Sequence, residues 1–203
     1  MPRRIETTAS RTAKMTCLSR AASFMETNPS YRSDDSIAPL LLPDFLRLLY
    51  HFSAIRNTIT RKIAPLGIYE YVIARTKYID DVFMRALVEQ FDQILIFGAG
   101  FDTRALRFQN TAQNTRLFEL DVPTTQLAKI RQYHHRGLTI PANLTFIAID
   151  FDKDSLSGKL DEDGFRKSQR CLFILEGLLM YLQPDSVRMT LRTIQEYAGK
   201  GRS

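Results

Sequence analysis

Apolar positions along the chain follow two different spacings. After Gly67 they recur at helical spacing as far as Leu87, which predicts one long helix. From residue 93 onward the pattern changes to four short, β-prone apolar runs, at 93–97, 115–120, 144–149 and 171–175. The segments between these runs are long enough to cross over a sheet, so the pattern predicts βαβ units. We therefore expect an α/β fold with a doubly wound, mostly parallel sheet.

Helix signals mark the connections between the predicted strands. The segment 123–136 starts with Pro123 and stops at Gly137, as helices often do. A last helix is predicted over 184–198, shortly before the sequence ends. A helix that packs on a sheet is normally followed by another strand. We therefore expect a domain that lacks its last strands, with the 171–175 run beside an open edge.

The first third of the chain differs from the rest. Prolines at positions 29, 39, 43 and 65 break it into short helices joined by turns, and Asp44 is the expected N-cap of a helix over 45–52. The chain is thus predicted to have two parts. Residues 1–66 form an N-terminal helical cap segment, and residues 67–203 form the α/β domain.

Composition and charge narrow the class of protein. The 203 residues are 44% hydrophobic and 25% charged, which suits one folded domain and excludes a wholly disordered chain. No apolar run approaches the roughly 18 residues that a membrane span needs, and two cysteines are too few for a disulfide scaffold. The net charge of +6 is spread out, without a basic run interleaved with aromatic residues and without zinc-ligand spacing. We expect a cytoplasmic protein with no metal site, no membrane partner and no nucleic-acid partner.

Glycines and acidic residues follow the predicted strands. In chain order the candidate site residues there are Gly98 and Gly100, Asp121, Asp150 with Phe151, and Glu176. Parallel strands present their carboxyl ends at one edge of a sheet, where open α/β folds bind ligands. An acid in such a place also commonly caps the next helix, which is the structural alternative for Asp121. A rim of several acids suits a ligand with hydroxyls, an amine and a cationic centre.

Arg75 is a further candidate, because it falls on the apolar stripe of the long predicted helix. A buried arginine needs an anionic partner. The alternatives are an internal salt bridge to Asp80 or Asp102, and a bidentate clamp on a ligand carboxylate. S-adenosylmethionine has a carboxylate, an amine, ribose hydroxyls and a positive centre. A dinucleotide instead wants a third glycine where this chain has Thr103.

Four blocks of sequence carry a resemblance to a known family. They are residues 74–81 (ARTKYIDD), 96–108 (IFGAGFDTRALRF), 118–123 (FELDVP) and 175–184 (LEGLLMYLQP). In this order and at this spacing they resemble the leucine carboxyl methyltransferase family of class I methyltransferases. Residues 9–13 and 19–21 resemble the opening helix of that family. The resemblance implies a Rossmann-like fold and S-adenosyl-L-methionine as the cofactor.

The resemblance also implies a role for each matching residue. Arg75 would hold the methionine carboxylate, Gly98 and Gly100 would form the glycine loop against the cofactor, Asp121 would bind the ribose hydroxyls, Asp150 with Phe151 would hold the adenine, and Glu176 would face the amino group. Asp102 and Arg104 belong to the same motif, and for them structural duties at the start of a helix are expected. Tyr181 is expected either to line the acceptor pocket or to pack.

The implied reaction is methyl transfer to an oxygen of a small-molecule or peptide acceptor. A carboxylate is ionised at neutral pH and needs no general base, whereas a hydroxyl needs one. The sequence identifies no catalytic residue. His134 and His135 are expected on the surface, and His51 is expected either to reach the pocket or to pack within the N-terminal segment.

Two other functions stay open at this point. The first is a truncated, catalytically inactive relative that only binds the cofactor or a partner chain, with self-association through the open sheet edge. The second is a nicotinamide oxidoreductase. That function would leave Arg75 and Glu176 without a role, and it expects a glycine at Thr103.

Overall fold

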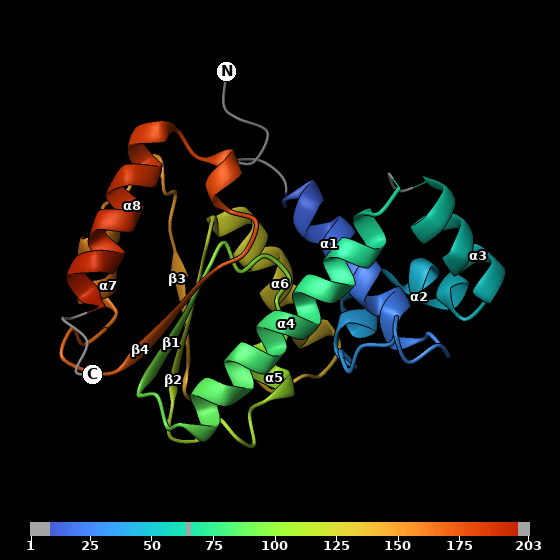
Figure 1. Ribbon diagram of the computed structural model, residues 1–203, viewed down its shortest axis with the longest axis horizontal. Coiled ribbons are helices and arrows are strands. Elements are labelled where there is room, and N and C mark those ends of the chain that lie inside the picture. Colours follow the sequence, from blue (N-terminus) through green and yellow to red (C-terminus); the bar gives the residue numbers. More distant parts are fainter. Residues whose placement is uncertain (1–8, 64–65, 199–203) are drawn as a thin grey trace.

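A parallel four-stranded sheet is the centre of the fold (Figure 1). The computed structural model describes residues 9–63 and 66–198. The strands are β1 (Gln93–Phe97), β2 (Arg116–Asp121), β3 (Leu144–Ala148) and β4 (Cys171–Leu175), in the order β3-β2-β1-β4. All three pairings are parallel. The predicted α/β fold with a parallel sheet is confirmed, and each strand begins and ends within one residue of its predicted range.

Helices cover both faces of this sheet. On one side lie α4 (Ile68–Val88), α5 (Arg104–Arg107) and α6 (Pro123–His135), and on the other lie α7 (Leu156–Glu162) and α8 (Pro184–Tyr197) (Figure 1). Alternate residues of β1 enter the two cores: Ile94 and Ile96 pack on the α4 side, and Leu95 and Phe97 pack on the α8 side. This double burial explains why β1 is apolar at every position after Gln93.

The predicted helix boundaries hold closely. Gly67 adopts a φ of +81° just before α4, and Gly137 adopts +62° just after α6. A positive φ is natural for glycine, so both residues suit the ends of helices. Pro123 and Pro184 open their helices, where the missing N–H costs nothing.

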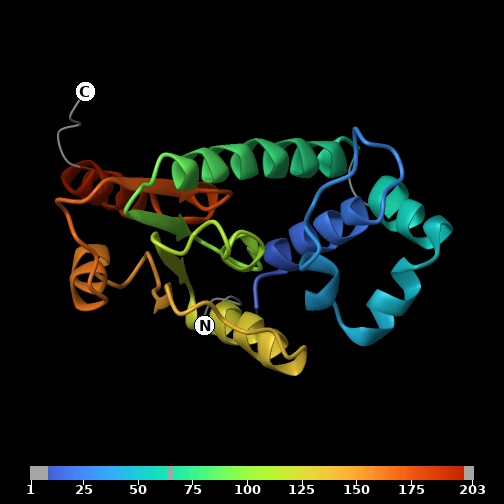
Figure 2. The same ribbon diagram turned by 90° about the horizontal axis from the view of Figure 1, so that it is seen from below.

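The N-terminal segment consists of short helices, as expected. They are α1 (Arg11–Phe24), η2 (Ala38–Leu41), α2 (Asp44–Tyr50), α3 (Ser53–Asn57) and η3 (Thr58–Ile63). Helix α1 packs alongside α4 and η2, between the rest of this segment and the sheet domain (Figure 2). The predicted division between residues 66 and 67 stays a prediction, and the stretches 1–8, 64–65 and 199–203 of the two predicted parts lie outside the described residues.

The predicted N-cap role of Asp44 is wrong. Asp44 is the first residue of α2, and Pro43 occupies the N-cap without a side-chain hydrogen bond. The Asp44 carboxylate instead accepts a hydrogen bond from Nη1 of Arg136, at 2.7 Å. This hydrogen bond lowers the pKa of Asp44. The Asp44 carboxylate therefore pairs with Arg136 at the end of α6 and does not cap the backbone N–H groups of α2, contrary to the prediction from the sequence.

Two further features concern the sheet edge and the helices of the described residues. Strand β4 pairs with β1 alone among the described strands, so it lies at the sheet edge, as predicted. Across residues 9–63 and 66–198, no helix combines the length and the apolar character that crossing a membrane requires.

Candidate functional site

A cavity of about 530 Å³ opens at the carboxyl ends of β1 and β4. Its walls come from the start of α1, the first half of α4, the loop after β1 and the segment from Glu176 to Leu182. The strand order changes direction between β1 and β4, and open α/β sheets bind ligands at such a switch point. The volume lies within the usual range for small-molecule sites.

The loop after β1 depends on its glycines. Gly98 and Gly100 have φ values of +62° and +54°, which other residues rarely adopt. A Cβ on Gly100 would lie 2.9 Å from Cβ of Ala13, and one on Gly98 would lie 3.1 Å from Cδ1 of Leu178. The chain thus turns tightly here, and α1 approaches the loop more closely than a side chain would permit.

Asp121 joins the end of β2 to this glycine loop. Its Oδ2 accepts the backbone N–H of Gly100, and its Oδ1 accepts that of Val122 at 2.6 Å. Burial raises the pKa of Asp121, and the two backbone hydrogen bonds oppose that rise. Each carboxylate oxygen has a second lone pair, so Asp121 can still accept hydrogen bonds from ligand hydroxyls.

Arg75 and Glu176 form an ion pair in the cavity wall. The Nε of Arg75, from α4, donates to Oε1 of Glu176, which follows β4, at 2.7 Å. Their side chains are 20% and 16% exposed. The salt-bridge alternative for Arg75 therefore had the wrong partner. Asp80 and Asp102 both bind the guanidinium of Arg104 instead.

Of the two predicted site residues after β3, Phe151 lines the cavity, whereas the side chain of Asp150 makes contacts within a turn. Phe151 lines the cavity, is 9% exposed, and packs with its ring centroid 5.9 Å from that of Phe97. Asp150 is not among the lining residues. Its carboxylate accepts the backbone N–H of Asp152 at 3.1 Å and lies 3.2 Å from Nζ of Lys153. Asp152 lines the cavity instead.

A model of the leucine carboxyl methyltransferase family matches residues 13–195 of the chain. The chain belongs to this family. The resemblance stated from the sequence is confirmed, and the parallel sheet agrees with the Rossmann-like fold that it implied.

Curated relatives are named as methyltransferases. One from Mycobacterium marinum is 28% identical over 198 residues, which are 94% of this chain and 60% of the relative. One from Mycolicibacterium smegmatis is 34% identical over 128 residues, 63% of this chain and 42% of the relative. One from Bacillus subtilis is 28% identical over 145 residues, 71% and 47%. All three carry the name "putative S-adenosyl-L-methionine-dependent methyltransferase". The chain spans 42–60% of the length of these relatives.

In this member of the leucine carboxyl methyltransferase family, most of the predicted site residues line the cavity. Those that line it are Arg75, Gly98, Gly100, Asp121, Phe151 and Glu176, and only Asp150 of the predicted set lies outside the lining. Tyr181 also lines the cavity, with its hydroxyl 3.1 Å from Oγ1 of Thr12. The individual ligand contacts stay predictions.

The histidines lie away from this site. His134 and His135 are exposed at the end of α6, as predicted. His51 is exposed and does not line the cavity, so neither expectation for it, pocket or packing, holds. Within residues 9–63 and 66–198, no group of three or more His, Cys, Asp or Glu side chains could hold a metal ion.

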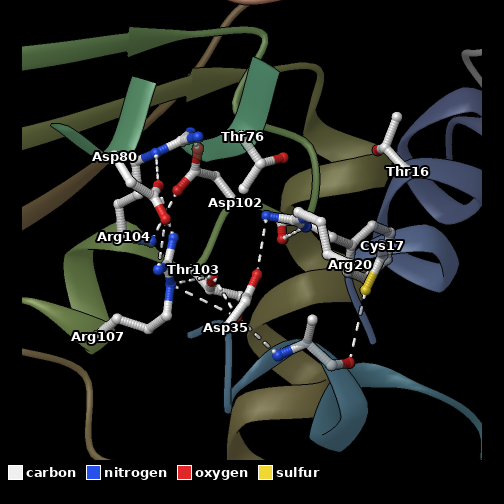
Figure 3. Close-up of polar contacts among 12 residues, drawn as sticks. Thr16, Cys17, Arg20, Asp35, Thr76, Asp80, Asp102, Thr103, Arg104 and Arg107 are labelled. Carbon is white, nitrogen blue, oxygen red and sulfur yellow. Dashed lines mark hydrogen bonds and ion pairs between the residues drawn. The ribbon is translucent and has the colours of Figure 1, made fainter. Parts of the chain in front are cut away.

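Sequence reasoning missed a buried ionic network beside the cavity (Figure 3). It links Arg20, Asp35, Asp80, Asp102, Thr103, Arg104 and Arg107. Asp102 has the predicted helix-start role, because its Oδ1 accepts the backbone N–H of Arg104 at 2.7 Å. Burial alone would raise the pKa of Asp102, but Arg104, Lys129 and Arg20 lower it to about 2. For Asp102, Arg104 and Arg107 the signal in the sequence was the run of charged residues within the glycine motif, and pairing them with the other members of the network required the fold.

Proposed function

We propose that this chain binds S-adenosyl-L-methionine in the cavity and transfers its methyl group to an oxygen of an acceptor. The observation that carries the proposal is the Arg75–Glu176 ion pair in the cavity wall, next to the glycine loop. An amino acid group carries one carboxylate and one ammonium. It can therefore take Arg75 and Glu176 as its two partners, in place of the contact that they make with each other.

The rest of the cavity fits the other parts of the cofactor. Asp121 offers acceptor oxygens for ribose hydroxyls, and the Phe151 ring offers an apolar face for the adenine. The backbone of Gly98 has no side chain to hold a ligand away. Asp150 has support only from the family resemblance, because its side chain is engaged in a turn outside the lining.

The cofactor would supply an electrophilic methyl group on a sulfonium. The chain's own residues bind the two reactants, orient them and exclude water, which is where this class of reaction gains most of its rate. The class of acceptor depends on whether a residue of the cavity lining can remove a proton from it as a general base.

A carboxylate acceptor fits the lining better than a hydroxyl. No histidine is among the described residues that line the cavity. Asp102 has a pKa of about 2 and is paired with Arg104, so it is a poor general base. Asp121 and Glu176 are held by backbone N–H groups and by arginines, and Oδ1 of Asp152 accepts the backbone N–H of Gln183 at 3.0 Å. A carboxylate needs no proton removed, so these engagements do not hinder its methylation.

The mouth of the cavity suits an acceptor with an apolar body. Tyr71, Met180 and Tyr181 line it and are 55%, 75% and 49% exposed. These side chains offer apolar and aromatic surface close to the site where the oxygen would be placed. A small molecule or a peptide end with an apolar group next to its carboxylate satisfies this requirement.

For protein partners, we propose that two copies of this chain associate through the edge strand β4, which pairs only with β1 among the described strands.

The proposal is tested with methyl-labelled cofactor and matched acceptors. 4-Phenylbutyrate and 4-phenylbutanol share an apolar body and differ in the acceptor oxygen. We expect label in the carboxylate only, released as methanol by mild alkali because the product is an ester. Arg75→Ala is the control and should abolish the incorporation. Transfer to the alcohol alone would contradict the choice of acceptor. Cofactor binding without transfer to any acceptor of a wider panel would favour the relative that only binds.

A further inference from the structure

We propose that Arg104 is a positioning residue, which fixes Glu176 for the amino group of the cofactor. The inference rests on the proposed function. Arg104 does not line the cavity, and its side chain is 1% exposed. It can therefore act on a ligand only through the side chains that it binds.

Arg104 binds three carboxylates from three different elements. Its Nε donates to Oδ1 of Asp80 on α4, at 2.7 Å, and its Nη1 donates to Oδ2 of Asp102 (Figure 3). The same Nη1 also donates to Oε2 of Glu176, at 3.1 Å. An arginine buried this deeply is costly unless its charge is well paired. Asp102 and Glu176 line the cavity, so two of its three partners face a ligand.

The two oxygens of Glu176 are held by different arginines. Arg75 binds Oε1 and itself lines the cavity, whereas Arg104 binds Oε2 from behind the wall. When Arg75 takes a ligand carboxylate, its contact with Glu176 is weakened. Arg104 then remains to hold the carboxylate in one orientation. We infer that this second anchor lets Arg75 serve the ligand without releasing Glu176.

Arg107 provides a matched control one turn further along the same helix. Its side chain is 4% exposed, and its Nη1 and Nη2 bind Asp80 at 2.7 and 2.8 Å. It also contacts Thr103 and Asp35, and its guanidinium carbon lies 4.8 Å from the ring centroid of Phe108. None of these partners lines the cavity. Arg107 thus shares the burial and the acidic partner of Arg104, without the link to Glu176.

The first experiment compares two ligands by calorimetric titration. S-adenosylhomocysteine has the amino acid group, and 5′-methylthioadenosine lacks it. In Arg104→Lys we expect roughly tenfold weaker binding of S-adenosylhomocysteine, the size of one lost charge-assisted hydrogen bond, with 5′-methylthioadenosine within about twofold of wild type. In Arg107→Lys the ratio of the two affinities should equal that of wild type. A parallel loss of both ligands in Arg104→Lys would show a merely structural role and overturn the inference.

A double-mutant cycle tests whether Arg104 acts through Glu176. In a Glu176→Gln background, Arg104→Lys should cost little further affinity for S-adenosylhomocysteine. Additive losses would contradict the inference. If Arg104→Lys does not fold, side-chain nitrogen NMR of the wild-type chain decides. The Arg104 guanidinium should keep hindered rotation in the S-adenosylhomocysteine complex, and a guanidinium freed by binding would overturn the proposal.

The outcomes separate this inference from the proposed function. Wild-type chain that is folded and binds neither ligand would contradict the proposed function, and the inference with it. Wild-type chain that binds S-adenosylhomocysteine, with an unchanged ligand ratio in Arg104→Lys, would contradict only the role of Arg104.

Discussion

Arg75, in the first half of α4, binds Glu176 after β4, and both side chains line the cavity. Replacing Arg75 with alanine removes the expected partner of a ligand carboxylate. We expect S-adenosylhomocysteine to bind roughly 10- to 100-fold more weakly by calorimetry, as suits lost charge-assisted hydrogen bonds. The free energy of unfolding should change by about 1 kcal/mol or less, because the pair is partly exposed and Arg104 still binds Glu176. Arg85→Ala, an exposed change on the same helix, is the control. Equal affinity in Arg75→Ala and wild type would contradict the assignment.

Asp102 supplies a prediction about acid stability. Its pKa in the folded chain, about 2, lies below the ordinary value of 3.8 because the charges of Arg104, Lys129 and Arg20 outweigh its burial. The stabilisation it gives is therefore present above pH 4 and is lost as the pH falls from about 4 toward 2. At pH 7 the free energy of unfolding of Asp102→Asn should be about 2 kcal/mol lower than that of wild type, and roughly half of that difference should remain at pH 3. Urea unfolding at both pH values measures it. A difference that does not change with pH would contradict this origin.

Individual residues of the site could be predicted from the sequence to different degrees. Gly98, Asp121 and Glu176 follow apolar runs directly, and the parallel topology alone brings strand ends together at one edge. The partner of Arg75 could not be predicted, because Asp80 on the same helix is taken by two other arginines. Asp150 failed to reach the cavity because the turn after β3 directs its carboxylate to Asp152 and Lys153.

At the scale of elements, the glycine loop and α1 depend on each other. Gly100→Ala adds a Cβ 2.9 Å from that of Ala13, in a backbone conformation that disfavours alanine. Gly137→Ala is a matched control, with a φ of +62° and no atom within 4 Å of the added Cβ. We expect Gly137→Ala to lower the free energy of unfolding by about 1 kcal/mol, because alanine disfavours this backbone conformation. Gly100→Ala should cost a further 1–3 kcal/mol or so from overpacking. Urea unfolding measures both. Equal losses would show that α1 does not press on the loop.

Elements were easier to predict than contacts. Apolar runs located all four strands, and Pro123, Gly137 and Pro184 located helix ends, because these signals act within a few residues. The N-cap prediction for Asp44 was wrong because its carboxylate binds Arg136, which is 92 residues away in the sequence. Local pattern carries no information about such a partner.

At the scale of the whole molecule, Asp35 ties the N-terminal segment to the sheet domain. Its side chain is 0% exposed and accepts hydrogen bonds from Thr103 at 2.8 Å and from the backbone N–H of Ala38 at 3.0 Å. Nη1 of Arg20, on α1, lies 3.3 Å away. Asp35→Asn should lower the free energy of unfolding by about 3 kcal/mol, because it leaves buried arginines short of a counter-charge. Asp34→Asn, next to it and exposed, should change it by less than about 0.5 kcal/mol. Similar values for the two variants would contradict the tie.

This long-range arrangement is the part of the molecule that the sequence conceals most. Asp35 lies in a polar stretch that reads as a turn, and nothing local marks it as buried. Arg20 falls in a helix whose apolar periodicity is weak. Both are explained only once α1 lies against the glycine loop, where Nη2 of Arg20 donates to the carbonyl of Phe101 at 2.5 Å.

The most direct test of cofactor binding in this cavity is calorimetric titration of the purified chain with S-adenosylhomocysteine. We expect saturable binding of one ligand per chain. The affinity should fall in Arg75→Ala and stay at the wild-type value in the control variant Arg85→Ala. A cooperative urea transition of the same sample would establish that the chain is folded. Absence of binding by a chain that unfolds cooperatively, with no shift of its thermal transition at high ligand concentration, would contradict the claim.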